Sequence, residues 1–67
     1  MWKWKKFEGD YLLYGLHGWA KVGKRAVGGW YVALGWRSSM KADRIQHTAS
    51  KVHAQTIGEG WIADTDV

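Results

Sequence analysis

The sequence lacks cysteine and proline altogether, and none of its apolar runs is long. Without cysteine there are no disulfides and no thiolate metal ligands, which fits a cytoplasmic location. Without proline there is no proline-rich linker. No segment approaches the ~20 consecutive apolar residues of a membrane span. The basic start, Met1-Trp2-Lys3-Trp4-Lys5-Lys6, is not followed by the apolar core of a secretory signal. We therefore expect neither a membrane partner nor secretion.

Recognisable catalytic and metal-binding patterns are also missing. His47 and His53 would lie about 120° apart on a helix, so they share no ligand face. No nucleophile elbow and no phosphate-binding glycine motif is present. A chain of 67 residues also leaves little room to enclose a pocket of ~300 Å³ beside a core. We expect a non-catalytic binding protein with no cofactor and no metal.

Aromatic residues and positive charge are abundant. The chain has six tryptophans, three tyrosines and one phenylalanine, and a net charge of +4. A chain this short buries only ~60% of the surface that it exposes when unfolded. Aromatic side chains bury ~150–250 Å² each and can replace many aliphatic residues in such a small core. We expect a single domain over 1–67.

The first half of the chain has the pattern of short strands. Residues 2–7 alternate between tryptophan and lysine, and further strands are predicted over 11–15, 18–22 and 29–36. The last of these places Trp30, Val32, Leu34 and Trp36 on one face, with Tyr31, Ala33 and Gly35 on the other. Short connections between consecutive strands favour an antiparallel meander.

The second half predicts one helix, over about 39–57. Ser38-Ser39 would provide its N-cap, and Gly58 would end it. Ile45 and Val52 would face the sheet, and an acidic tail would follow at 64–67. The predicted class is α+β, with a small antiparallel sheet of three to four strands covered on one face by a single C-terminal amphipathic helix.

One slim helix cannot cover so many aromatic rings. Some of them must lie on the open face of the sheet or at a subunit interface, which would make the protein a homo-oligomer through its aromatic face. The alternative is that the N-terminal strand folds over the open face and forms a second apolar cluster. The sequence leaves both possibilities open.

Basic residues interleaved with aromatics make nucleic acid or an acidic protein surface the expected partner. A lysine-rich strand edge can also serve only to discourage aggregation. Taken together, the cluster favours binding, and the candidate binding residues are Trp2, Lys3, Trp4, Lys5, Lys6, Trp19, Lys21, Lys24, Arg25, Tyr31 and Arg37.

Gly18-Trp19-Ala20, Gly29-Trp30-Tyr31-Val32-Ala33 and the helix predicted from Ser39 resemble small β-β-β-α DNA-binding modules. These modules include AP2-type domains and the arm-binding domains of tyrosine recombinases, and the resemblance covers about 11–57. It implies that strands enter the major groove, with Lys21, Lys24, Arg25 and Arg37 near DNA.

The short, aromatic-rich chain also looks like the small orphan proteins of bacteriophages. That likeness implies an alternative function, a regulator or inhibitor that binds a host complex such as RNA polymerase or a nuclease through a tryptophan-rich surface.

Overall fold

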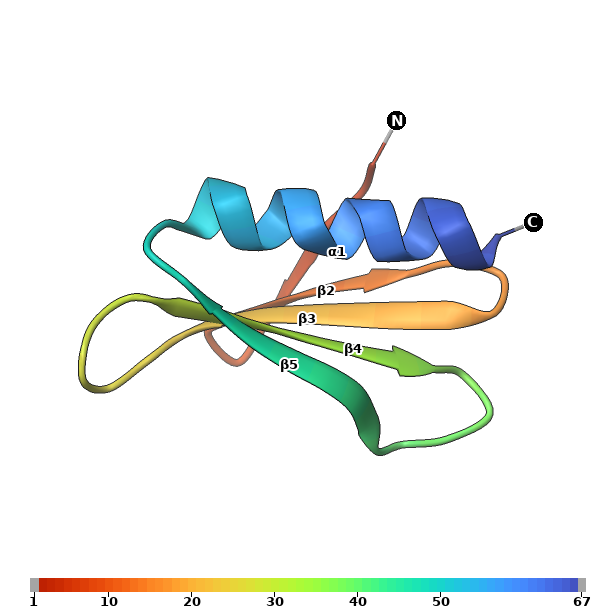
Figure 1. The fold of residues 1–67 in the computed structure, drawn as a ribbon, viewed down its shortest axis with the longest axis horizontal. Coiled ribbons are helices and arrows are strands. Elements are labelled where there is room, and N and C mark those ends of the chain that lie inside the picture. Colours follow the sequence, from red (N-terminus) through yellow and green to blue (C-terminus); the bar gives the residue numbers. More distant parts are fainter. Residues whose placement is uncertain (1, 67) are drawn as a thin grey trace.

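The computed structural model describes residues 2–66 and places one helix across one face of an antiparallel sheet (Figure 1). The strands follow one another in sequence order, and each pairs with the next. The α+β class and the single C-terminal helix are confirmed, but the sheet has five strands instead of three to four. The elements are β1 (Lys5–Phe7), β2 (Asp10–Tyr14), β3 (Gly18–Lys24), β4 (Trp30–Trp36), β5 (Ala42–Thr48) and α1 (Lys51–Thr65).

Glycine supplies the tight turns of this meander. The β1–β2 hairpin turns at Glu8 and Gly9, with φ of 52° and 86°. Positive φ at both central residues is the hairpin geometry that matches the twist of the flanking strands. The β3–β4 hairpin turns through Gly28 and Gly29, which also have positive φ. These turns set the strand register and so decide which side chains share a face.

The side of the sheet beneath α1 forms the core. Register places Leu13, Ala20 and Leu34 in one cross-strand row and Val22 beside Val32 in the next. All five are buried, and Ala20, Val22 and Val32 are buried completely. The predicted division of 30–36 into two faces is confirmed, because Val32 and Leu34 face the core while Tyr31, Ala33 and Gly35 take the alternate positions.

Small residues bring α1 close to the sheet. Ala54, Gly58 and Ile62 are spaced four apart and buried. A Cβ atom on Gly58 would lie 2.8 Å from Cη2 of Trp4 and 3.0 Å from Cβ of Ala20, so no side chain fits there. The exposed side of the helix still carries Val52, so the helix is only weakly amphipathic. No helix in residues 2–66 has both the length and the apolarity to cross a membrane.

Ser50 is the N-cap of α1, and its side chain accepts a hydrogen bond from the His53 N–H at 3.1 Å. Removing a serine N-cap leaves a helix N–H without a partner. We expect Ser50→Ala to lower the free energy of unfolding by about 1 kcal/mol, measured by urea denaturation. Ser38→Ala, at the cap that the sequence suggested, is expected to change stability by less than ~0.5 kcal/mol. Equal effects of the two substitutions would contradict this assignment.

The helix predicted over 39–57 is wrong in its position. Residues 42–48 form β5, because the edge of β4 offers them a ladder of backbone partners from Trp30 to Gly35, interrupted by a register shift between Leu34 and Gly35. Ile45 and Val52, predicted to face the sheet, are 59% and 68% exposed. Gly58 does not end the helix, since it lies at the closest approach of α1 to the sheet.

The ends of the chain also differ from the prediction. The predicted acidic tail over 64–67 begins inside α1, and Asp66 is the C-cap of that helix. Met1 and Val67 lie outside the described residues. The predicted strand over 2–7 is shortened to β1. Trp4 instead packs against the helix side of the core, where its Nε1–H donates to Glu59 Oε2 at 2.9 Å.

Candidate functional site

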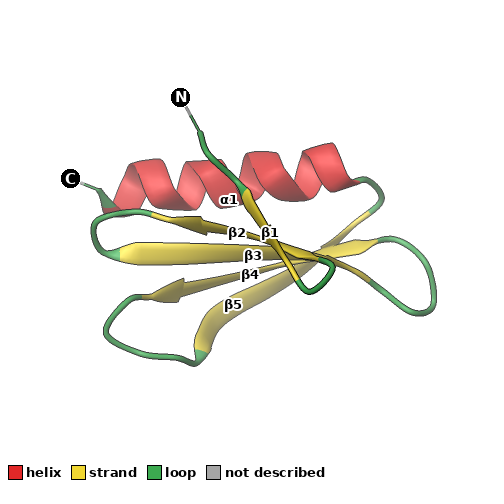
Figure 2. Cartoon of the chain, turned by 180° about the vertical axis from the view of Figure 1, so that it is seen from behind, coloured by secondary structure: helices red, strands yellow, loops and turns green. Residues whose placement is uncertain are grey.

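The face of the sheet opposite α1 carries no second layer of secondary structure in residues 2–66 (Figure 2). We call it the open face. Cross-strand pairing defines three rows of side chains on it. The central row is Lys5, Leu12, Lys21, Ala33 and Ile45. The row towards the β1–β2 turn is Phe7, Asp10, Gly23, Tyr31 and His47. The row towards the β2–β3 turn is Tyr14, Trp19, Gly35 and Ala42.

Two aromatic rings on the open face lie across glycines of the neighbouring strand. A Cβ on Gly35 would lie 2.4, 2.5 and 2.7 Å from three ring atoms of Trp19. A Cβ on Gly23 would similarly lie 2.4 and 2.6 Å from two ring atoms of Tyr31. Each ring therefore occupies the space that a side chain at the neighbouring glycine would fill, and at Gly23 the Asp10 carboxylate shares that space with Tyr31.

The Trp19 indole is held in place by the chain that follows β4. Its Nε1–H points to two carbonyl oxygens, Trp36 O at 3.1 Å and Ser39 O at 3.2 Å. These hydrogen bonds fix the ring orientation and anchor the loop between β4 and β5. A ring held in place before binding loses little conformational freedom when a ligand stacks on it.

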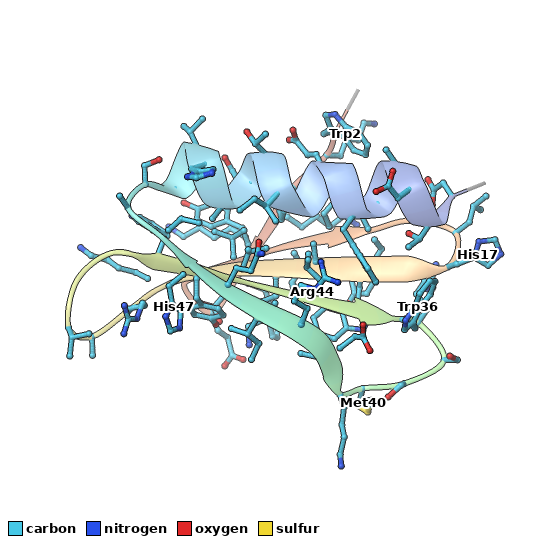
Figure 3. All side chains as sticks on the ribbon, viewed as in Figure 1. Trp2, His17, Trp36, Met40, Arg44 and His47 are labelled. Carbon is cyan, nitrogen blue, oxygen red and sulfur yellow. The ribbon has the colours of Figure 1, made fainter. Side chains whose placement is uncertain are left out.

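A depression of about 370 Å³ lies beside Trp19. This volume is larger than expected for so short a chain, and it is possible because the depression is open to solvent and does not interrupt the core. Met40, at its rim, is 99% exposed and lies in the β4–β5 loop (Figure 3). The lining residues are Leu12, Tyr14, Trp19, Arg37, Ser39 and Met40.

Positive charge accompanies these rings. The Arg37 guanidinium lies 5.5 Å from the centre of the Tyr14 ring and donates to Gly15 O at 3.1 Å. Lys21 Nζ lies 3.3 Å from Asp10 Oδ2. The hydrogen bond to Asp10, followed by the charge of Tyr31, raises the pKa of Lys21 above its usual range. For the lysine side of the pair, the stabilisation is fully present below the ordinary lysine pKa of 10.5 and is lost as the pH rises through the raised pKa of Lys21.

The structure brings together five of the candidate residues predicted from the sequence. Lys5, Trp19, Lys21 and Tyr31 share the open face, and Arg37 lies at its edge beside Tyr14.

The other six candidates do not join them. Trp4 packs on the helix side of the sheet, and Lys6 lies there too, 5.9 Å from the centre of the Tyr11 ring. Trp2 lies beside α1 (Figure 3), and Lys3 precedes β1. Lys24 pairs with Trp30 on the helix side, and Arg25 belongs to the β3–β4 loop. The basic N-terminal segment is therefore not part of one surface with Trp19, because the chain crosses to the helix side before β1.

The positions of the tryptophans decide between the two arrangements that the sequence left open. Trp4, Trp30 and Trp61 pack half-buried against the core on the helix side. Trp36 contacts Trp61 there, and Trp2 lies beside α1, so Trp19 alone among the described tryptophans occupies the open face. The N-terminal strand does not fold over this face, because β1 joins the edge of the sheet beside β2. Within residues 2–66 no other element covers the open face, but it carries one tryptophan, because most of the rings lie on the helix side.

Sequence reasoning missed the glycines beneath the rings and the residues that line the depression. The available signal was a glycine inside a strand, which often marks a close approach of other groups to the backbone. Gly23 and Gly35 are such glycines, and each pairs directly with an aromatic residue. Tyr14 and Met40 carry no comparable signal, because the pairing of β2 with β3 places Tyr14 beside Trp19 and the β4–β5 loop places Met40 there.

No group of three or more histidine or acidic side chains among residues 2–66 is arranged to hold a metal ion. Comparisons with protein-family models, curated proteins and solved structures found no match to this chain, so the geometry of the open face carries the functional proposal.

Proposed function

We propose that the open face binds single-stranded nucleic acid, with bases on Trp19 and Tyr31 and phosphates near the basic side chains between and beside them. The observation that carries the proposal is the pair of aromatic rings that lie over glycines on the open face, with Lys21 in the row between them. Proteins that bind single strands without strong sequence preference combine aromatic stacking surfaces with a basic track in this way.

The spacing of the two rings sets the length of strand that they engage. Trp19 and Gly23 are four residues apart on β3, and Tyr31 covers Gly23. At ~3.3 Å per residue, the rings are about 13 Å apart along the strand. Bases on rings that lie side by side cannot stack on one another, so the strand between them is more extended than the ~3.4 Å per nucleotide of a stacked strand, and fewer than about four nucleotide steps reach from one ring to the other.

The flat rings favour single strands over duplexes. In a duplex the bases stack on one another, and proteins read only their edges by inserting side chains into a groove. Trp19 and Tyr31 lie against the sheet and cannot reach into a groove. They present π faces, which only an unpaired base can cover.

Salt dependence tests the proposal. We expect a fluorescently labelled oligothymidylate to bind, with the logarithm of the association constant falling against the logarithm of salt concentration with a slope of about −2. The reason is that Lys5, Lys21 and Arg37 would neutralise phosphates, and each phosphate contact on a single strand contributes a slope of ~0.7. Fluorescence anisotropy over a range of salt concentrations measures it.

Two variants define the control and the contrary result for this titration. Lys3→Ala, outside the open face, is expected to leave the slope unchanged, whereas Lys21→Ala is expected to reduce it. A flat salt response, or no binding at low salt, would contradict the proposal and leave a protein partner as the alternative.

A charge-removing variant is expected to increase affinity. Asp10 holds Lys21 in an ion pair and adds a negative charge to the open face. Exposed ion pairs are worth ~0.2–1 kcal/mol. We therefore expect Asp10→Asn to strengthen oligothymidylate binding by roughly two- to fivefold, measured by anisotropy at low salt. Glu8→Gln, which removes the same charge from the exposed β1–β2 turn, is the matched control and should have a smaller effect. Weaker binding of the Asp10 variant would argue against a phosphate at Lys21.

A further inference from the structure

We propose that the depression beside Trp19 is a nucleotide subsite, which takes one unpaired base against the outer face of the indole and places the phosphate of that nucleotide on Arg37. The inference rests on the proposed function and adds the chemistry of one position within the open face. It concerns the depression at the Tyr14–Trp19 end, whereas Lys21 and Tyr31 lie further along the sheet.

The floor and walls of the depression suit a planar aromatic ligand. Trp19 supplies a π face in a fixed orientation, because its Nε1–H is hydrogen-bonded to two backbone carbonyls. Leu12 and Tyr14 add apolar surface from the adjacent strand β2. The volume of about 370 Å³ falls within the ~300–1,000 Å³ range of small-ligand sites. A base that enters here would stack on the indole without moving the sheet.

Arg37 is placed for a phosphate at the edge of the same depression. Its guanidinium lies over the Tyr14 ring, 5.5 Å from the ring centre, and donates one hydrogen bond from Nη1 to Gly15 O. A guanidinium has five N–H donors in a planar fork, so several donors remain for a ligand. Arginine binds phosphate oxygens with paired charge-assisted hydrogen bonds. None of the six lining residues is acidic, so no carboxylate in the depression competes for Arg37.

Met40 provides a second, movable side to the subsite. Its side chain is 99% exposed at the rim, and the carbonyl of the preceding residue, Ser39, accepts a hydrogen bond from Trp19. Methionine is flexible and polarisable, and its thioether makes favourable contacts with aromatic rings. A base stacked on Trp19 would allow the Met40 side chain to close over it and bury its methyl group.

The test uses the whole chain, labelled for NMR, titrated with adenosine 5′-monophosphate and, separately, with adenosine. The signals followed are the Trp19 indole N–H and the Met40 methyl group, assigned with Trp19→Phe and Met40→Leu. We expect both signals to shift with either ligand, and the monophosphate to bind roughly five- to tenfold more tightly than the nucleoside. In Arg37→Gln this difference is expected to disappear, while the Trp19 shift with adenosine remains.

Each contrary result has its own meaning. Equal affinity for the nucleoside and the monophosphate would overturn the role of Arg37 and with it the subsite as proposed. If oligothymidylate shifts the signals of Lys21 and Tyr31 but the mononucleotides leave Trp19 and Met40 unmoved, the subsite is wrong and the proposed function stands. If the monophosphate shifts Trp19 and Met40 but no oligonucleotide binds, the subsite stands and the proposed function is wrong.

Discussion

Replacing Trp19 with alanine is expected to weaken oligothymidylate binding by more than tenfold. Stacking of a base on an aromatic side chain contributes ~1–3 kcal/mol, which corresponds to about 5- to 150-fold in the dissociation constant. Trp19 should lie in the upper part of this range, because the indole is the largest ring on the open face and is held rigidly by Trp36 O and Ser39 O. Anisotropy titrations of the wild type and the variant at one salt concentration give the ratio.

Two further variants separate stacking from other effects of the substitution. Trp19→Phe keeps a π face but loses the N–H that holds the ring to Trp36 O and Ser39 O, and it should bind more weakly than the wild type and more tightly than Trp19→Ala. Trp2→Ala removes an equally large ring that is 44% exposed but lies beside α1, and it should bind as the wild type does. If Trp2→Ala and Trp19→Ala weaken binding equally, the open face is not the binding surface.

A single added methyl group at Gly35 is expected to weaken binding almost as much as the loss of the indole. A Cβ at this position would lie 2.4 Å from Cζ2 of Trp19, closer than atoms can approach, so the ring must lift off the sheet. Lifting the ring breaks its hydrogen bonds to Trp36 O and Ser39 O and tilts its π face. We expect Gly35→Ala to cost about 1–3 kcal/mol of binding free energy, measured in the same anisotropy titration.

The matched control for Gly35→Ala is Gly60→Ala. Gly60 lies on the exposed side of α1, and a Cβ there would meet no atom within 4 Å. Alanine should raise stability by up to about 1 kcal/mol through its higher helix propensity and leave binding unchanged. If a folded Gly35→Ala variant binds oligothymidylate as tightly as the wild type does, the position of the Trp19 ring over Gly35 does not matter for binding.

The strands of the first half could be predicted because their local signals agree with their tertiary role. The stretch from Trp30 to Trp36 is rich in aromatic and aliphatic residues, and its alternate positions face the core and the open face. Glu8-Gly9 and Gly28-Gly29 provide the positive φ that the hairpins need. Here propensity, pattern and turn chemistry all favour the same fold.

The second half could not be predicted in the same way, because its elements depend on partners elsewhere in the chain. Residues 42–48 are mostly polar, and five of them in succession are exposed, so no alternation marks them as a strand. They form β5 because β4 supplies the hydrogen-bonding edge. Gly58 is tolerated inside α1 because Trp4 and Ala20 fill the space where its side chain would be. Tertiary packing overrides helix propensity in both cases.

The candidate site was predictable only where it coincides with a strand pattern. Trp19, Lys21 and Tyr31 lie in well-predicted strands, so their alternate positions place them on one face. Trp4 and Lys24 have the same residue chemistry but lie on the other side, because the chain direction before β1 and the register at the end of β3 put them there. The sequence indicates which residue types bind, and the register decides which of them can act together.

The most direct test of the open face as the binding surface is a map of amide and side-chain chemical shifts on titration with oligothymidylate. The largest changes are expected at Trp19, Lys21, Tyr31, Gly35 and Arg37, with little change at the exposed helix residues Val52, His53 and Thr56. Changes concentrated on α1 and beside Trp2, with the open face unaffected, would contradict the assignment of the binding surface.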